Sequence, residues 1–267
     1  MNTNEQIIKF FDQTFHDSKF QSTLEKMNQD FFQDNDHFKR LYDKWMAYYH
    51  ESMTLHEAIE IFILVSDEMI SVEEPQWEMI AGRFLAFDIH QQVEKHMQSL
   101  HLLTFYDKIN YLTQEGYYGA YILEYYNKQD IQELETYIDD ERDGFFNHSG
   151  LDLLCKRYLI HDYQHQILET PQEMFMGIAM HLAIKEKKRV QWAKQFYDVL
   201  STLKITMATP TMANARKPFH QMSSCFIDVV EDSLEGIYQS LDHFAQVSKY
   251  GGGMGLYFGK VRANGSS

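Results

Sequence analysis

The chain has 267 residues and a formal net charge of −15, with 24 Lys and Arg against 39 Asp and Glu. This excess of carboxylates argues against a protein that binds nucleic-acid phosphates, and against electrostatic binding to an anionic membrane, because both need clustered cations. Apolar residues make up 44% of the chain, so there is ample material for a packed core and no compositional sign of disorder.

The start of the chain and its cysteine content indicate the compartment. The first ten residues, MNTNEQIIKF, contain no basic segment followed by an apolar run, so no secretory signal is expected. The longest apolar run, residues 61–65, is far shorter than the ~20 residues needed to cross a bilayer. Two cysteines cannot build a disulfide framework. We therefore expect a soluble, cytoplasmic protein.

Glycine and proline are distributed unevenly along the chain. No glycine precedes Gly82, whereas five of the thirteen glycines lie between residues 251 and 259. The scarcity of helix-breaking residues predicts a helical structure for roughly the first two thirds, with a different architecture beginning near Pro210. Residues 1–50 are rich in aromatic side chains and are expected to form helices.

Local signals mark where several helices begin. Residues 54–57 (Thr-Leu-His-Glu) form a capping box, in which the Thr hydroxyl and the Glu carboxylate satisfy free amides of the first turn. Residues 170–173 combine the same spacing with a proline, and Pro75 opens a further helix. Apolar residues at helical spacing predict another helix over 190–203.

The last part of the chain predicts an α/β arrangement. Residues 222–230 suit a short, buried strand, and residues 256–261 suit a second one. Between them, residues 232–235 (Asp-Ser-Leu-Glu) cap a helix expected to run to about Lys249 and to end at Gly251. Two strands leave an open edge with unpaired amides and carbonyls. We therefore expect that further chain, or another polypeptide, completes the fold.

Candidate reactive groups are few. Cys225, at the head of the first predicted strand, has two interpretations: a buried thiol that packs as a small apolar group, or a redox or nucleophilic thiol at a strand end. Cys155 lies in an apolar run and is expected in the core. The glycine-rich run 251–260 matches neither common phosphate-binding motif. Histidines, cysteines and carboxylates do not have the spacing of a structural metal site, so no metal is expected.

Taken together, residues 200–266 resemble the large subunit of class I ribonucleotide reductase. Five elements carry the resemblance in order: a Thr-Pro turn (209–210), a Ser-Ser-Cys strand (223–225), Asp-Ser-Leu at a helix start (232–234), a glycine-rich turn (251–255) and the loop Val-Arg-Ala-Asn-Gly-Ser (261–266). Weaker similarity extends back to the segment SVEEPQWEMIAGRFLAF, residues 71–87.

The resemblance implies a fold and a division of the chain. The family has a mainly α domain followed by a ten-stranded α/β barrel, so this chain is expected to hold the helical domain and the first strand–helix–strand of the barrel, which stays incomplete. We expect a helical extension over 1–50, the helical reductase domain over 51–215 and the start of the catalytic barrel over 216–267. Residues 1–50 lack the V-x-K-R-D-G motif of the family's ATP-binding cone, so no activity site of that kind is expected.

The resemblance also assigns roles to individual residues. Cys225 matches the catalytic cysteine beside the substrate 2′-carbon, which helps expel the 2′-hydroxyl as water and then forms a disulfide with a second cysteine. The positions that match substrate-binding residues are Thr209, Ser224, Cys225 and Gly253. The positions that match the site for the deoxynucleotide or ATP effector, which selects the base to be reduced, are Asp232, Ser233, Leu234 and Arg262. Asp232 at a helix start suits a ribose hydroxyl, and Arg262 suits a phosphate.

Several elements of the family lie later in its chain than this sequence extends: the radical-bearing cysteine, the second redox cysteine and the C-terminal thiol pair. The chain by itself is therefore expected to be inactive and to bind no cofactor other than the effector. Its implied partners are the C-terminal portion of the large subunit, a small subunit with a dimetal radical cofactor, a second large subunit and a nucleoside diphosphate. Two other hypotheses are open: an inactive half-chain that binds regulatory nucleotides, and a helical interaction protein.

Overall fold

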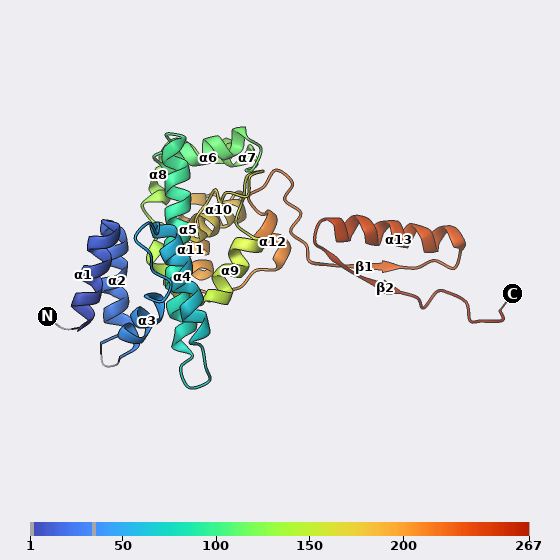
Figure 1. Cartoon of the computed structure of the whole chain (residues 1–267). Helices are drawn as coiled ribbons and strands as arrows, with labels where there is room; N and C mark the ends of the chain where they lie inside the picture. Colours follow the sequence, from blue (N-terminus) through green and yellow to red (C-terminus); the bar gives the residue numbers. More distant parts are fainter. Residues whose placement is uncertain (1–2, 34–35, 267) are drawn as a thin grey trace. The chain divides into compact units, whose positions relative to one another are not determined.

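The computed structural model describes residues 3–33 and 36–266 (Figure 1). The chain divides into two compact units, each made of two stretches of sequence. The first unit comprises Met1–Leu103 and Asp139–Met174, and the second comprises Thr104–Ile138 and Phe175–Ser267. Ser267, where the sequence stops, lies outside the described residues.

The first unit is built from helices. Its longest helix, α5, packs against α4, and α2, α9 and a 3-10 helix, η1, also pack on α5. The bounds of its elements are α1 Thr3–Phe15, α2 Ser18–Phe31, α3 His37–Trp45, α4 Leu55–Glu68, α5 Gln76–Ser99, η1 Asp140–Phe145 and α9 His148–Arg157. The prediction that the aromatic-rich beginning of the chain is helical is confirmed by α1, α2 and α3.

The helix starts that the sequence predicts are confirmed. At the start of α4, the Glu57 amide donates to the Thr54 hydroxyl (3.2 Å) and the Thr54 amide donates to the Glu57 carboxylate (2.7 Å). Thr170 and Glu173 make the same reciprocal pair at the start of α10 (Pro171–Leu182), with distances of 3.3 and 2.8 Å. Pro75 stands at the N-cap of α5. The reciprocal pairs satisfy amides that the first turn of a helix cannot pair internally.

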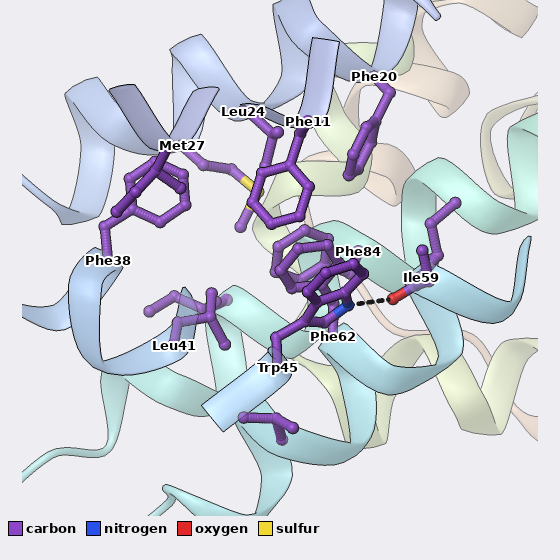
Figure 2. Close-up of a cluster of buried hydrophobic side chains, with 14 of the residues drawn as sticks. Phe11, Phe20, Leu24, Met27, Phe38, Leu41, Trp45, Ile59, Phe62 and Phe84 are labelled. Carbon is purple, nitrogen blue, oxygen red and sulfur yellow. Dashed lines mark hydrogen bonds between the residues drawn. The ribbon is translucent and has the colours of Figure 1, made fainter. Parts of the chain in front are cut away.

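An aromatic cluster forms the core of the first unit around Phe62 of α4 (Figure 2). The Phe62 ring stacks on Phe84 of α5 with 4.5 Å between centroids, and on Trp45 of α3 with 5.2 Å. Phe11 of α1 meets the same ring edge-on at 5.1 Å. The Trp45 indole donates to the Ala58 carbonyl at 3.0 Å, so its one polar atom is paired. The helices of residues 3–45 thus share one core with α4 and α5.

Four histidine–carboxylate pairs link separate segments of the first unit: His37 with Glu74 (2.7 Å), His56 with Asp88 (2.7 Å), His90 with Asp143 (2.7 Å) and His148 with Asp67 (2.9 Å). Burial lowers the pKa of His56 and of His90, but the hydrogen bonds and charges of Asp88 and Asp143 outweigh it. The net result is a raised pKa for both imidazoles. The His56–Asp88 and His90–Asp143 contacts are therefore strengthened when the histidine carries its second proton.

The second unit contains a helical part and a small sheet. Within the helical part α8 packs on α6 and on α11. The bounds of its elements are α6 Phe105–Gln114, α7 Tyr121–Tyr125, α8 Lys128–Glu135, α11 Arg189–Ser201, α12 Thr209–Asn214, β1 Cys225–Val229, α13 Leu234–Lys249 and β2 Gly253–Tyr257; the last part of α10 also belongs to it. None of the helices in the described ranges has the length and apolar content that crossing a membrane requires.

The sheet consists of β1 and β2, which pair in parallel with α13 as the crossover between them (Figure 1). The predicted order of strand, helix and strand is confirmed. Cys225 is in register with Gly253, and Val229 with Tyr257. The α13 cap is Ser233, whose hydroxyl accepts from the Gly236 amide at 3.0 Å.

The second strand differs from its predicted position. It begins at Gly253, whereas the sequence predicts Leu256, and it ends at Tyr257. Gly251 has a φ of +82° and ends the helix, so the chain turns within a few residues and enters the strand while still in the glycine run. Glycine adds no apolar signal to a strand pattern, which explains why these positions are not recognised from sequence.

The prediction that the first strand is buried is wrong for this chain. Ile227 is 87% exposed, and Cys225 and Val229 on the same face are exposed too. α13 packs against both strands, and one helix covers only one face of a sheet. The alternation along each strand therefore leaves the face with Cys225 open within the described part of the chain.

Removing the cap of α4 is expected to weaken the first unit. Thr54→Ala leaves the Glu57 amide without its acceptor, so the free energy of unfolding should fall by about 1 kcal/mol. Denaturant titration followed by tryptophan fluorescence measures this, because Trp45 and Trp77 are buried in this unit. Thr23→Ala, within α2, removes only a hydroxyl that donates to the Lys19 carbonyl of the same helix; it is the control and should change stability by less than about 0.5 kcal/mol. Equal effects of the two variants would contradict the role of the cap.

The stability of the first unit should depend on pH above neutrality. A raised pKa means that the folded chain binds the histidine proton more tightly than the unfolded chain does. The stabilisation from the protonated histidine is therefore complete below the ordinary pKa of 6.5 and is lost as the pH rises through the raised value. The free energy of unfolding should therefore fall as the pH rises above 6.5, and should fall less in His90→Gln. The exposed His50→Gln is the control and should keep the full dependence. An unchanged slope in His90→Gln would refute this account.

Candidate functional site

Cys225 lies at the amino end of β1, where an exposed sulfur follows a half-exposed serine. The Ser224 hydroxyl is 3.5 Å from the Cys225 Sγ, and the Ser224 carbonyl accepts from the Gly253 amide at 2.7 Å. Gly253 is also the register partner of Cys225 on β2. Three of the four residues predicted to bind substrate therefore meet at one corner of the sheet.

Neither Gly253 nor Gly255 needs to be glycine for the packing of this chain. A Cβ at Gly253 would meet the Ser224 carbonyl at 3.6 Å, and one at Gly255 would meet the Phe226 carbonyl at 3.9 Å, both ordinary contacts. Among the glycines of the described residues, Gly116, Gly251 and Gly265 have positive φ values, and these two do not. Their missing side chains leave the surface beside Cys225 flat and open, which suits the close approach of another group.

Thr209, the remaining predicted substrate residue, lies outside the sheet as the first residue of α12. The end of α12 is tied to the segment that leads into β1. The Asn214 side chain donates to the Gln221 carbonyl at 2.9 Å, and the Thr211 hydroxyl donates to the Met222 carbonyl at 3.4 Å. These contacts were not recognisable from sequence, because no periodic pattern marks a side chain that bonds to backbone several residues later.

The residues predicted to bind the effector gather at the other end of the sheet. Asp232 follows β1 and Arg262 follows β2, and the Arg262 Nε donates to the Asp232 carboxylate at 2.7 Å. Ser233 caps α13, and the next residue, Leu234, is 73% exposed. Since β1 spans Cys225–Val229, the two sites are separated by about 13 Å of strand.

A second ion pair runs beside the first. Lys260 donates to Glu231 at 2.6 Å, so two cations that follow β2 each hold a carboxylate that follows β1. Three of the four side chains are more than half exposed and the Asp232 carboxylate is one third exposed, so each pair contributes about 0–1 kcal/mol. Arg262 can therefore leave Asp232 for a better anion at little cost.

The two cysteines have different surroundings. Cys155, in α9 of the first unit, is half-buried, which corrects the prediction of a core position. Burial there raises the pKa of its thiol to about 12, so this sulfur stays protonated near neutral pH. Cys225 is the exposed thiol. Across residues 3–33 and 36–266, His, Cys, Asp and Glu side chains form no group of three that is suited to hold a metal ion.

Two family models match adjacent parts of the chain. The model described as "Ribonucleotide reductase, all-alpha domain" matches residues 144–220, and the one described as "Ribonucleotide reductase, barrel domain" matches residues 223–267. The division between the two matches falls just before Ser224 and Cys225.

Similar proteins extend the match towards the amino terminus. The ribonucleoside-diphosphate reductase subunit alpha of Treponema pallidum is 47% identical over 253 residues, which is 94% of this chain and 30% of that protein. The proteins of the same name from Helicobacter pylori (36% identical, 82% of this chain and 27% of that protein) and phage T4 (35%, 85% and 30%) are also similar. The chain thus spans less than a third of the length of these relatives. It belongs to the ribonucleotide reductase large-subunit family and corresponds to the all-alpha domain and the start of the barrel domain of that family.

Proposed function

We propose that this chain is the amino-terminal part of a ribonucleoside-diphosphate reductase large subunit, in an enzyme that converts ribonucleoside diphosphates to 2′-deoxyribonucleoside diphosphates. The observation that carries the proposal is the corner of the sheet where the exposed Cys225 thiol lies beside Ser224 and Gly253. The thiol supplies redox chemistry, and the glycine leaves room for a ribose next to the sulfur. Ser224, with Thr209, is assigned to hold the diphosphate substrate.

The proposed reaction consumes two thiols for each substrate. The C2′–O bond of the ribose breaks, the hydroxyl leaves as water and a hydrogen takes its place on C2′, while the two thiols become one disulfide. Cys225 is assigned as one of them. Burial raises the pKa of the Cys155 thiol, which disfavours its reactive thiolate form, so we assign the second thiol to the later part of the large subunit. The radical that starts the reaction is assigned to a small-subunit partner with a dimetal cofactor.

The other end of the sheet is assigned to the deoxynucleotide effector. Its positive group is Arg262, whose exposed pair with Asp232 is easily exchanged for a phosphate. The freed Asp232 carboxylate then accepts from a ribose hydroxyl, and the exposed side chain of Leu234 offers an apolar surface to the base. A dimer of large subunits is part of the same proposal.

A regulatory half-chain is the second candidate, and one observation favours it. All four residues predicted for the effector site lie in this chain, whereas only one of the two thiols that the reaction needs is assigned here. This alternative predicts effector binding with no gain of reductase activity when the C-terminal portion of a large subunit is added.

Cys225→Ser should reduce multiple turnover with a thiol reductant to background in the complete large subunit, because a hydroxyl cannot form the disulfide. Cys155→Ser is the matched control and should keep its turnover. In the chain by itself, an alkylating reagent at pH 7.5 should modify Cys225 well before Cys155, whose pKa is raised. Normal turnover by Cys225→Ser would rule out the assigned role.

Arg262→Gln should weaken binding of a deoxynucleoside triphosphate to the complete large subunit by about 10- to 100-fold, the worth of one charged hydrogen bond. Equilibrium dialysis with a labelled effector measures the affinity. Lys260→Gln removes the neighbouring exposed ion pair and is the control, with a change of less than about threefold expected. Equal losses in the two variants would indicate a general charge effect and would contradict a specific role for Arg262.

A further inference from the structure

Ten residues without helix or strand, 215–224, lead from α12 to Cys225. They include Ser224, and they decide where β1 begins relative to the helical part of the second unit. A segment of this kind lacks the regular backbone hydrogen bonds of a helix or strand, so its position depends on contacts with other elements. The contacts at its start come from the residues around the beginning of α7.

Two hydrogen bonds fix the start of the segment. The Tyr121 hydroxyl donates to the Ala215 carbonyl at 2.6 Å, and the Gly119 amide donates to the Arg216 carbonyl at 2.9 Å. A longer contact of 3.4 Å joins the Tyr121 hydroxyl to the Lys217 carbonyl. Ala215 and Arg216 are buried, so these carbonyls have few alternative partners in water.

His181 of α10 makes a hydrogen bond to the Tyr121 hydroxyl, which in turn donates to the Ala215 carbonyl. Its Nδ1 is 2.8 Å from the Tyr121 oxygen. Burial, with the neighbouring His220, lowers the pKa of His181 to about 4, so the imidazole is neutral at neutral pH, while burial raises the pKa of Tyr121. Tyrosine has a single proton, and it is directed to Ala215. His181 must therefore donate from Nδ1 to the tyrosine oxygen, which it orients.

His220, within the segment, packs on the same pair. Its ring lies 4.8 Å from the Tyr121 ring and 5.1 Å from the His181 ring. Asn214 then closes the loop by donating to Gln221. The segment is thus held to Tyr121 both at Ala215 and at His220, immediately before the residues that lead into Cys225.

We propose that Tyr121, oriented by His181, is a positioning residue for the Cys225 corner. It holds segment 215–220 and so sets where Ser224 and Cys225 stand, without touching the substrate itself. The effect on catalysis rests on the proposed reductase function, whereas the effect on the segment does not depend on it.

Tyr126 provides a matched control. It lies in the same unit, burial raises its pKa too, and its hydroxyl donates to the Met180 carbonyl of α10 at 2.8 Å. Tyr126→Phe therefore removes a comparable tyrosine–carbonyl bond that involves no residue of 215–224. A loss of stability common to both variants would be structural, and only a difference between them reports on the segment.

Hydrogen exchange on the full chain is the first test. In Tyr121→Phe, the Lys217 and Gly119 amides, which donate to Asn214 and Arg216, should exchange on the order of tenfold faster, and Tyr126→Phe should leave both near wild type. His181→Ala should behave like Tyr121→Phe, whereas His181→Asn, which keeps an N–H close to the Nδ1 position, should restore slow exchange. Equal acceleration in Tyr121→Phe and Tyr126→Phe would overturn the proposal.

The second test uses the complete large subunit with its partner. Tyr121→Phe should raise the KM for the nucleoside diphosphate by about five- to tenfold with a smaller change in kcat, and Tyr126→Phe should change neither by more than about twofold. Faster exchange of the segment with unchanged KM and kcat would also overturn the positioning role. Failure of the proposed function itself is recognised separately, by normal turnover of Cys225→Ser.

Discussion

Parallel pairing of β1 with β2 is the constraint on which both candidate sites depend. In a parallel pair the amino ends of the strands share one edge and the carboxyl ends share the other. Cys225 and Gly253 are therefore register partners at one end, and Asp232 and Arg262 meet just beyond the other. An antiparallel pair of the same strands would set Cys225 opposite the end of β2 and would separate both sets. The crossover through α13 makes the parallel arrangement possible.

The two ends of the sheet are held with very different strengths. Beyond the carboxyl ends, the contacts are ion pairs between largely exposed side chains, which solvent weakens and a ligand can replace. Before the amino ends, the approach to β1 is held by bonds to the buried residues Ala215 and Arg216, and a buried carbonyl that loses its donor is costly. This difference is consistent with the proposed assignment, in which an effector exchanges partners at one end and the substrate site at the other end keeps its geometry.

The first unit relies on contacts between segments that are far apart in sequence. Phe62 contacts aromatic rings from α1, α3 and α5, so the amino-terminal helices are part of its core. Histidine–carboxylate pairs then tie α4 to α5 and α5 to η1. Aromatic packing is insensitive to pH and the pairs are not, so the apolar core sets the fold while the pairs adjust its stability.

The sequence by itself determined the features whose cause is local. The Thr54–Glu57 and Thr170–Glu173 pairs predict helix starts correctly, because a capping box is complete within one turn of chain. The order of strand, helix and strand also follows from short-range patterns, and the motifs around Cys225 and Arg262 identify the family. The roles of the individual site residues stay predictions, because they depend on groups that bind from outside this chain.

The tertiary structure alone decided what depends on distant partners. The position of β2 follows from its register with β1, and the sequence does not predict it because the glycines at the start of β2 give no apolar signal. The exposure of Ile227 follows from the fact that a single helix covers the sheet. Tyr121 of α7 and Ala215, the C-cap residue of α12, are 94 positions apart in the sequence, and nothing near either residue signals their hydrogen bond. Local patterns specify backbone conformation within a few residues, whereas burial, register and long-range hydrogen bonds exist only once separate segments have packed together.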